Sequence, residues 1–171
     1  MQYAKAFGLQ VIGIDHGSKR DFCLEMGNDH FLDFTEFNST GLGLKVKELS
    51  EGGCHAVMVC NASSRAYDQA LDFLRYAGTL VCVGIPEIDP HPMPKTAPWQ
   101  IIVNQWKIKG AVTGNRQMAV DCLKPTTLGQ VHRARPKAGL GRIHRARLLD
   151  SEYDQQCKPR LLGGDLQYYV R

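Results

Sequence analysis

Residues 9–15, LQVIGID, and residues 79–86, TLVCVGIP, are the two apolar runs that decide the fold. Each follows a glycine, and the second ends at a proline, which cannot donate a hydrogen bond to a neighbouring strand. Both runs are rich in β-branched residues and have the length of one strand. We therefore predict a β-strand at each.

Other strands and amphipathic stretches alternate around these two runs. Residues 3–7 are expected to form the last turns of a helix, and further helices are expected at 18–26, 40–49, 63–77 and 115–123. Further strands are expected at 30–34, 55–61 and 106–113, with a short apolar element at 99–105 and a proline-rich loop at 86–98. This alternation is typical of an α/β fold with a doubly wound parallel sheet.

Composition sets the class of protein. The 171 residues are 43% hydrophobic and 22% charged, which fits a single globular domain and excludes fibrous and disordered chains. No apolar run is long enough for a membrane helix, so we expect a cytoplasmic protein that does not bind membranes. The six cysteines and six histidines have no metal-binding spacing, so we expect free thiols and no metal site.

Charge divides the chain at Leu123. Up to that residue there are 11 basic and 13 acidic residues, and after it 10 basic and 4 acidic. We therefore expect a partial domain over 1–123 and a divergent, poorly ordered basic tail over 124–171. A nucleic-acid-binding arm is the competing interpretation, but no aromatic residues interleave with the arginines of 133–147, so we expect no nucleic-acid partner.

Several polar and glycine residues follow the predicted strands. Ligands of an open parallel sheet bind where the strands have their carboxyl ends. Asp15 ends one strand, and a carboxylate there can accept both hydroxyls of an adenosine ribose, although it can equally face water. Loops follow the other predicted strands in the same way. They contain Asn61, then Val83, Gly84 and Ile85, and then Thr113 and Arg116.

The order of these pieces resembles a known family. The runs QYAKAFG, VIGID, HFLDFT, LRYAGTLVCVGIP and GNR are similar, in sequence and spacing, to the cofactor domain of zinc-dependent alcohol dehydrogenases of the medium-chain family. The resemblance covers residues 2–123 and implies a Rossmann domain that binds NAD. It implies that Asp15 holds the adenosine ribose, with Lys19 or Arg20 beside it, and that Gly84 and Ile85 flank the nicotinamide. It also implies that Arg116 meets the pyrophosphate.

The chain departs from that family in three places. The glycine-rich turn and the strand before it are missing, and that strand is the central one of the family's sheet, so we expect two strand edges without partners. The catalytic zinc domain is also absent, so we predict no catalytic residue and no metal ligand here. The end of the chain matches only faintly.

Two functions remain open from the sequence. The chain is either the NAD-binding portion of an alcohol dehydrogenase, inactive by itself, or a non-catalytic remnant that binds nucleotide weakly or pairs with an intact dehydrogenase subunit. The family forms dimers or tetramers, so a second copy is a further candidate partner. Trp99 and Trp106 pack either against such a partner or against the chain's own sheet.

Overall fold

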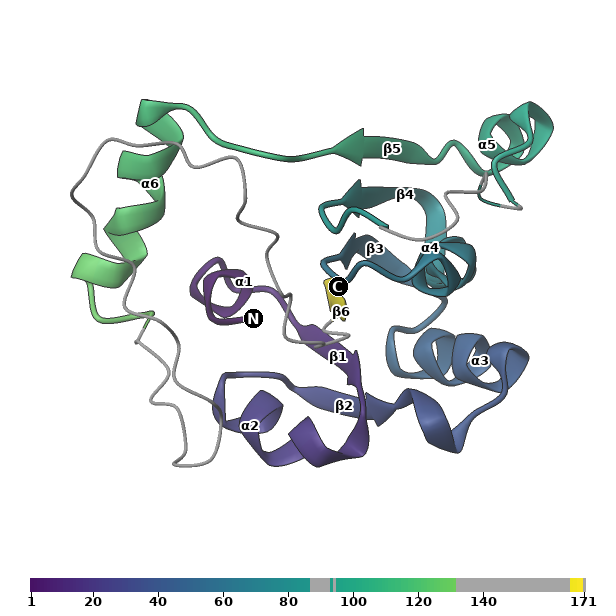
Figure 1. The fold of residues 1–171 in the computed structure, drawn as a ribbon, viewed down its shortest axis with the longest axis horizontal. Helices are drawn as coiled ribbons and strands as arrows, with labels where there is room; N and C mark the ends of the chain where they lie inside the picture. Colours follow the sequence, from purple (N-terminus) through teal and green to yellow (C-terminus); the bar gives the residue numbers. More distant parts are fainter. Residues whose placement is uncertain (87–92, 94, 132–166, 171) are drawn as a thin grey trace, which may run out of the picture. The chain divides into compact units, whose positions relative to one another are not determined.

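The computed structural model describes residues 1–86, 93, 95–131 and 167–170, all within one compact unit. Within these ranges, six strands form one sheet in the order β2-β1-β6-β3-β4-β5 (Figure 1). They are β1 (Val11–Asp15), β2 (His30–Asp33), β3 (Cys54–Val59), β4 (Leu74–Cys82), β5 (Lys107–Gly110) and β6 (Gln167–Val170). β1 pairs in parallel with β2, and β4 pairs in parallel with β3 and β5. The predicted α/β fold with a parallel sheet is confirmed.

Helices alternate with the strands along the described parts of the chain. They are α1 (Gln2–Ala6), α2 (Arg20–Glu25), α3 (Ser39–Leu49), α4 (Ser64–Ala70), α5 (Pro98–Asn104) and α6 (Arg116–Thr127), with 3-10 turns at Gly17–Lys19, Phe34–Glu36 and Leu71–Phe73. Two helices begin at an asparagine whose side chain accepts a backbone N–H bond: Asn38 from Gly41 and Asn115 from Met118. Such bonds satisfy amide groups that the first turn of a helix leaves without partners.

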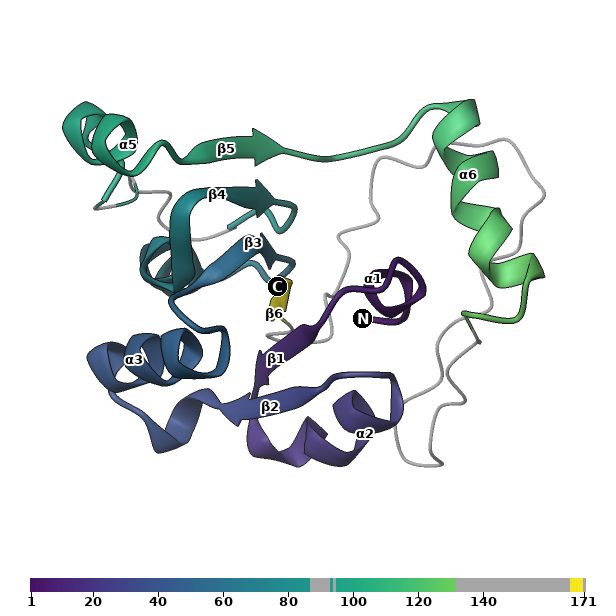
Figure 2. The ribbon, with the colours of Figure 1, turned by 180° about the vertical axis from the view of Figure 1, so that it is seen from behind.

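β6 corrects the expectation that two strand edges lack partners. It lies between β1 and β3 and pairs antiparallel with both, with Tyr169 opposite Ile12 on one side and Val57 on the other. The reverse view keeps it at the centre of the row of strands (Figure 2). Among the described residues, β6 is the link that joins the two parallel parts of the sheet.

The helix expected over 63–77 is much shorter in the structure. α4 ends at Ala70, and β4 already begins at Leu74, which lies in register with Cys54 of β3. The backbone at Ala77 is left-handed, with φ of 58°, and the β3–β4 register shifts in this region. The apolar spacing over 63–77 predicts a helix face, but the prediction is wrong after Ala70, because residues from Leu74 onward pair with β3 instead.

Two further boundaries differ from expectation. The helix expected over 18–26 begins only at Arg20, after a 3-10 turn over Gly17–Lys19 that is capped by His16, whose ring nitrogen accepts from the Ser18 N–H. α6 continues past Leu123 to Thr127, with Pro125 inside it. Residues 132–166 and 171, most of the predicted tail, lie outside the described residues, as do 87–92 and 94 of the predicted proline-rich loop.

The core lies between the sheet and its helices. Its largest fully buried side chains include Phe73, Leu71, Leu80 and Ile12. Trp106 packs partly buried against this core and donates its ring N–H to the Arg75 carbonyl at 3.2 Å. The side chain of Trp99 is 65% exposed, so the two tryptophans have different environments.

Candidate functional site

The carboxyl ends of the parallel strands place several polar groups along one edge of the sheet. β1 and β2 end at Asp15 and Asp33, which are register partners. β3 is followed by Asn61, and β4 by Val83 and Gly84. Ligand sites of open α/β sheets lie at such an edge, because the loops and helix starts gather there.

Asp15 is held inside this edge rather than facing water. Its side chain is 1% exposed, its oxygen accepts the His16 backbone N–H at 2.7 Å, and the Lys19 ammonium lies 3.0 Å from both carboxylate oxygens. The 3-10 turn over Gly17–Lys19 brings Lys19 back over the strand end. Lys19 is part exposed, so a ligand's hydroxyl groups can reach the carboxylate if the lysine side chain swings aside.

Asp33 is a second carboxylate at this edge, and the sequence reasoning missed it. It accepts the Thr35 hydroxyl at 2.7 Å and the Thr35 backbone N–H at 2.8 Å, and these hydrogen bonds lower the pKa of Asp33. A Cβ atom at Gly17 would lie 2.2 Å from its carboxylate oxygen. The signal was present, because Asp33 ends its strand as Asp15 does.

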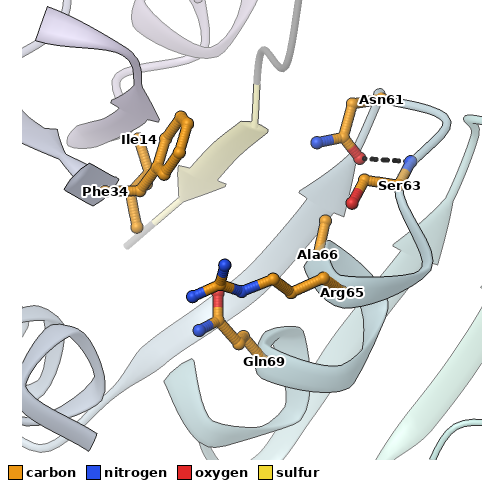
Figure 3. A pocket seen from close by; sticks show the side chains of 7 residues that line it. All are labelled: Ile14, Phe34, Asn61, Ser63, Arg65, Ala66 and Gln69. Carbon is orange, nitrogen blue, oxygen red and sulfur yellow. Dashed lines mark hydrogen bonds between the residues drawn. The ribbon is translucent and has the colours of Figure 1, made fainter. Parts of the chain in front are cut away.

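A small hollow of about 60 Å³ lies beside these strand ends. Figure 3 shows Ile14 and Phe34 on one side of it, and Asn61, Arg65 and Gln69 on the other. Arg65 makes no hydrogen bond or ion pair with any described residue, and Figure 3 draws none between it and the other residues that line the hollow. Neither Arg65 nor Phe34 was predicted, although Arg65 stands in the first turn of the helix that follows β3.

The loop after β4 is tied tightly to its neighbours. The Val59 carbonyl accepts the N–H groups of both Val83 and Gly84 at 3.0 Å. A Cβ atom at Gly84 would lie 1.8 Å from the Asn61 carbonyl oxygen, so only glycine fits here. The structure thus brings together the predicted residues Asn61, Val83 and Gly84.

A second hollow, of about 330 Å³, opens beside this loop. It is lined largely by apolar groups, among them Val83 and Ile85 after β4, Val112 after β5, and Met93 between β4 and α5. Ile85 is 69% exposed and lies at its rim. A hollow of this kind suits a flat, largely apolar ring.

Other predicted residues are not gathered into this edge. Arg20 lies over the Phe31 ring, 5.9 Å from its centroid, whereas Lys19 takes the place beside Asp15. Thr113 and Arg116 are exposed, and neither makes a hydrogen bond or ion pair with the part of the chain that the structure describes. Their predicted contact with a ligand remains a prediction.

The described residues do not form a metal site. Within them, no three His, Cys, Asp or Glu side chains form a group that could hold a metal ion. The five cysteines in the described part form no disulfide, and burial raises the pKa of Cys60 and Cys82 and brings that of Cys23 to about 11. Such thiols stay protonated at neutral pH and bind metals poorly. In the same ranges, no helix has the length and apolar character needed to cross a bilayer.

Comparison with known proteins gives a consistent family. The model of the zinc-binding dehydrogenase family matches residues 1–125. Alcohol dehydrogenase 2 of Emericella nidulans is 41% identical over 134 residues, which are 75% of this chain and 36% of that protein. Alcohol dehydrogenase 2 of Caenorhabditis elegans is 33% identical over 77% of this chain and 36% of its own length. The chain therefore spans about a third of the curated relatives that it matches.

Solved structures agree on the fold. The alcohol dehydrogenase of Aeropyrum pernix superposes with a TM-score of 0.59 at 20% identity, over 70% of this chain and 33% of its own. The D-arabinose dehydrogenase of Sulfolobus solfataricus gives 0.62 at 19% identity, over 76% and 39%. At these identities the likeness shows the fold alone, which is Rossmann-like.

Proposed function

The chain belongs to the zinc-binding dehydrogenase family of alcohol dehydrogenase-like oxidoreductases, and from that membership we propose that it forms the NAD-binding portion of an enzyme that interconverts alcohols and aldehydes or ketones. One observation carries the proposal: a buried aspartate, Asp15, ends β1 at the sheet edge where the glycine loop after β4 and both hollows also lie.

Asp15 is the proposed ribose ligand. Its two carboxylate oxygens already accept hydrogen bonds from Lys19, so they are oriented to accept two hydroxyl groups instead. Its negative charge repels a 2′-phosphate, which favours NAD over NADP. The hollow between Phe34 and Arg65 is the adjoining surface for the adenine ring, because a planar guanidinium and an aromatic ring both stack on flat bases.

The remaining predicted residues are proposed for the other parts of the cofactor. Gly84 and Ile85 flank the nicotinamide beside the larger hollow, with Asn61 and Val83 fixing the backbone of that loop. Arg116 and Thr113 face the pyrophosphate in this proposal. When bound, NAD supplies the nicotinamide that accepts a hydride from the alcohol carbon.

Zinc does not fit the described residues. They hold no group of three ligands, and their buried thiols have raised pKa values, so we assign no step to a metal here. We accordingly propose that this chain binds NAD without turning over alcohol by itself. The second candidate is a non-catalytic protein that binds nucleotide weakly or pairs with an intact dehydrogenase subunit.

An exposed apolar surface favours a subunit partner. Trp99, Ile102 and Val103 of α5 are 65%, 71% and 64% exposed. They lie next in sequence to β5, an edge strand whose four residues are all exposed. We propose that a second copy or an intact dehydrogenase subunit covers this surface, as an apolar patch beside an open strand edge is a site of association.

The cofactor proposal is tested by titrating the full chain with NADH and with NADPH. We expect NADH to bind at least about tenfold more tightly than NADPH, and Asp15→Ala to weaken NADH binding about tenfold, the equivalent of about 1.4 kcal/mol. Asp21→Ala is the matched control, because it removes an exposed carboxylate from the first turn of α2 without touching Asp15. If the alanine variant does not unfold cooperatively, Asp15→Asn, which keeps the side-chain shape, takes its place. Equal affinities for wild type and the Asp15 variant would exclude the ribose role.

Turnover separates the two candidate functions. We expect the full chain to form no NADH from NAD and ethanol in the presence of zinc. The same result is expected when zinc is left out of the assay. Steady NADH formation that requires zinc would contradict the proposal that the chain does not turn over alcohol by itself.

A further inference from the structure

Tyr67 of α4 reaches the loop after β4 with its hydroxyl group. The side chain is 7% exposed. Its hydroxyl donates to the Gly84 carbonyl at 2.6 Å and lies 3.5 Å from the Val59 carbonyl. In the part of the chain that the structure describes, it is the side-chain donor that holds this loop.

The other contacts of the loop act on different atoms. The N–H groups of Val83 and Gly84 are held by the Val59 carbonyl, and the Cα atom of Gly84 lies against the Asn61 backbone. The Gly84 carbonyl has its bond from Tyr67. The Gly84 carbonyl belongs to the next peptide plane, which joins Gly84 to Ile85 and receives neither of the Val59 bonds, so the Tyr67 bond fixes the plane from which Ile85 projects.

Tyr67 keeps its proton under all ordinary conditions. Burial is the main cause that raises the pKa of this phenol, to about 12. The hydroxyl therefore remains a donor at neutral and mildly alkaline pH. A donor that stays protonated gives the loop one conformation before any ligand arrives, and preorganisation of this kind improves affinity.

We propose that Tyr67 is a positioning residue, which fixes the Gly84 carbonyl and thereby holds Gly84 and Ile85 in the orientation that receives the nicotinamide ring. The effect on the ring rests on the proposed NAD function, whereas the effect on the loop does not. Tyr67 lines the hollow of about 330 Å³ together with Gly84 and Ile85, so the residue that positions the loop also forms the wall behind it.

The test compares Tyr67→Phe with Tyr76→Phe in the full chain. The first removes the hydroxyl and keeps the ring, and the second removes a hydroxyl from a tyrosine that is 60% exposed. Backbone amide hydrogen exchange is measured at Val83 and Gly84, and NADH affinity by titration. We expect Tyr67→Phe alone to speed exchange at these two amides about fivefold and to weaken NADH binding about fivefold, as the loss of one hydrogen bond predicts.

Each outcome has one meaning. Faster exchange confined to Val83 and Gly84 supports the positioning role, whereas unchanged exchange at both overturns it. A rise spread evenly over β3 and β4 also overturns it, because that pattern reports general loss of stability. If wild type binds no NADH, the proposed function fails, and the exchange measurement still decides whether Tyr67 holds the loop.

Discussion

Replacing Tyr169 by proline tests whether β6 holds the sheet together. The proline removes one backbone N–H from a strand that is paired on both sides, so the bond is lost whichever neighbour receives it. The facing residues are Ile12 and Val57, which are 1% and 0% exposed, so water does not reach the carbonyl that loses its donor. A buried group left without its bond costs about 1–3 kcal/mol, and we take about 2 kcal/mol.

Urea denaturation measures this loss. With a denaturant slope of about 2 kcal/mol per M, a cost of about 2 kcal/mol lowers the unfolding midpoint by about 1 M. Arg171→Pro is the control, since position 171 follows the last residue of β6, and it is expected to leave the midpoint unchanged.

Hydrogen exchange provides a second measurement that does not depend on the variant folding. In the wild-type chain, the amides of β1 and β3 that face β6 are expected to exchange much more slowly than those of the edge strand β5. Equal midpoints for wild type and Tyr169→Pro, together with fast exchange in β1 and β3, would refute the placement of β6 between them.

Three further outcomes follow from local contacts. Gly84→Ala is expected to destabilise the protein by about 1–3 kcal/mol in urea denaturation, because its Cβ would overlap the Asn61 carbonyl oxygen at 1.8 Å; unchanged stability would mean that the loop moves freely. Asn28→Leu is expected to stabilise by about 1 kcal/mol in the same assay, since both polar atoms of this buried amide lack partners among the residues that the structure describes, and a loss of stability would reveal a bonding partner. Burial raises the pKa of Asp29, but hydrogen bonds from Lys5 and the Val11 N–H outweigh it and hold that pKa below the ordinary 3.8. The stabilisation by the ionised Asp29 carboxylate is therefore complete above about pH 3.8 and is lost as the pH falls through the lowered pKa of the folded protein. Asp29→Asn should flatten this part of the curve of unfolding midpoint against pH.

Much of the fold could be predicted from short stretches of sequence. The stretches 11–15, 54–59 and 79–82 are short and largely apolar, which is the composition expected of strands that contribute to a core, and β1 is buried at all five of its residues. Asp15 was identifiable as a candidate because a parallel strand places its last residue at the edge of the sheet where ligands of such folds bind. Asn115 and its helix were predicted for a similarly local reason, since the cap and the amide it binds are three residues apart.

Other features required the tertiary structure. The expected end of α4 was wrong because Leu74 pairs with Cys54, and a helical spacing of apolar residues carries no information about that competing strand. Arg65 and Phe34 approach the same hollow from segments about 30 residues apart, so no motif joins them. The Tyr67 bond to Gly84 depends on the crossing of a helix over a loop 17 residues away.

The strongest division lies between the strands of the parallel sheet and β6. A local apolar pattern determined the inner parallel strands β1, β3 and β4, because their core residues, such as Val11, Val57 and Leu80, are apolar. The place of Gln167–Val170 depended on an open slot between β1 and β3, more than 100 residues earlier in the chain. Main-chain hydrogen bonds to the edges of β1 and β3 hold the strand in that slot. Because almost any sequence can form such bonds, only the assembled sheet decided where this strand lies.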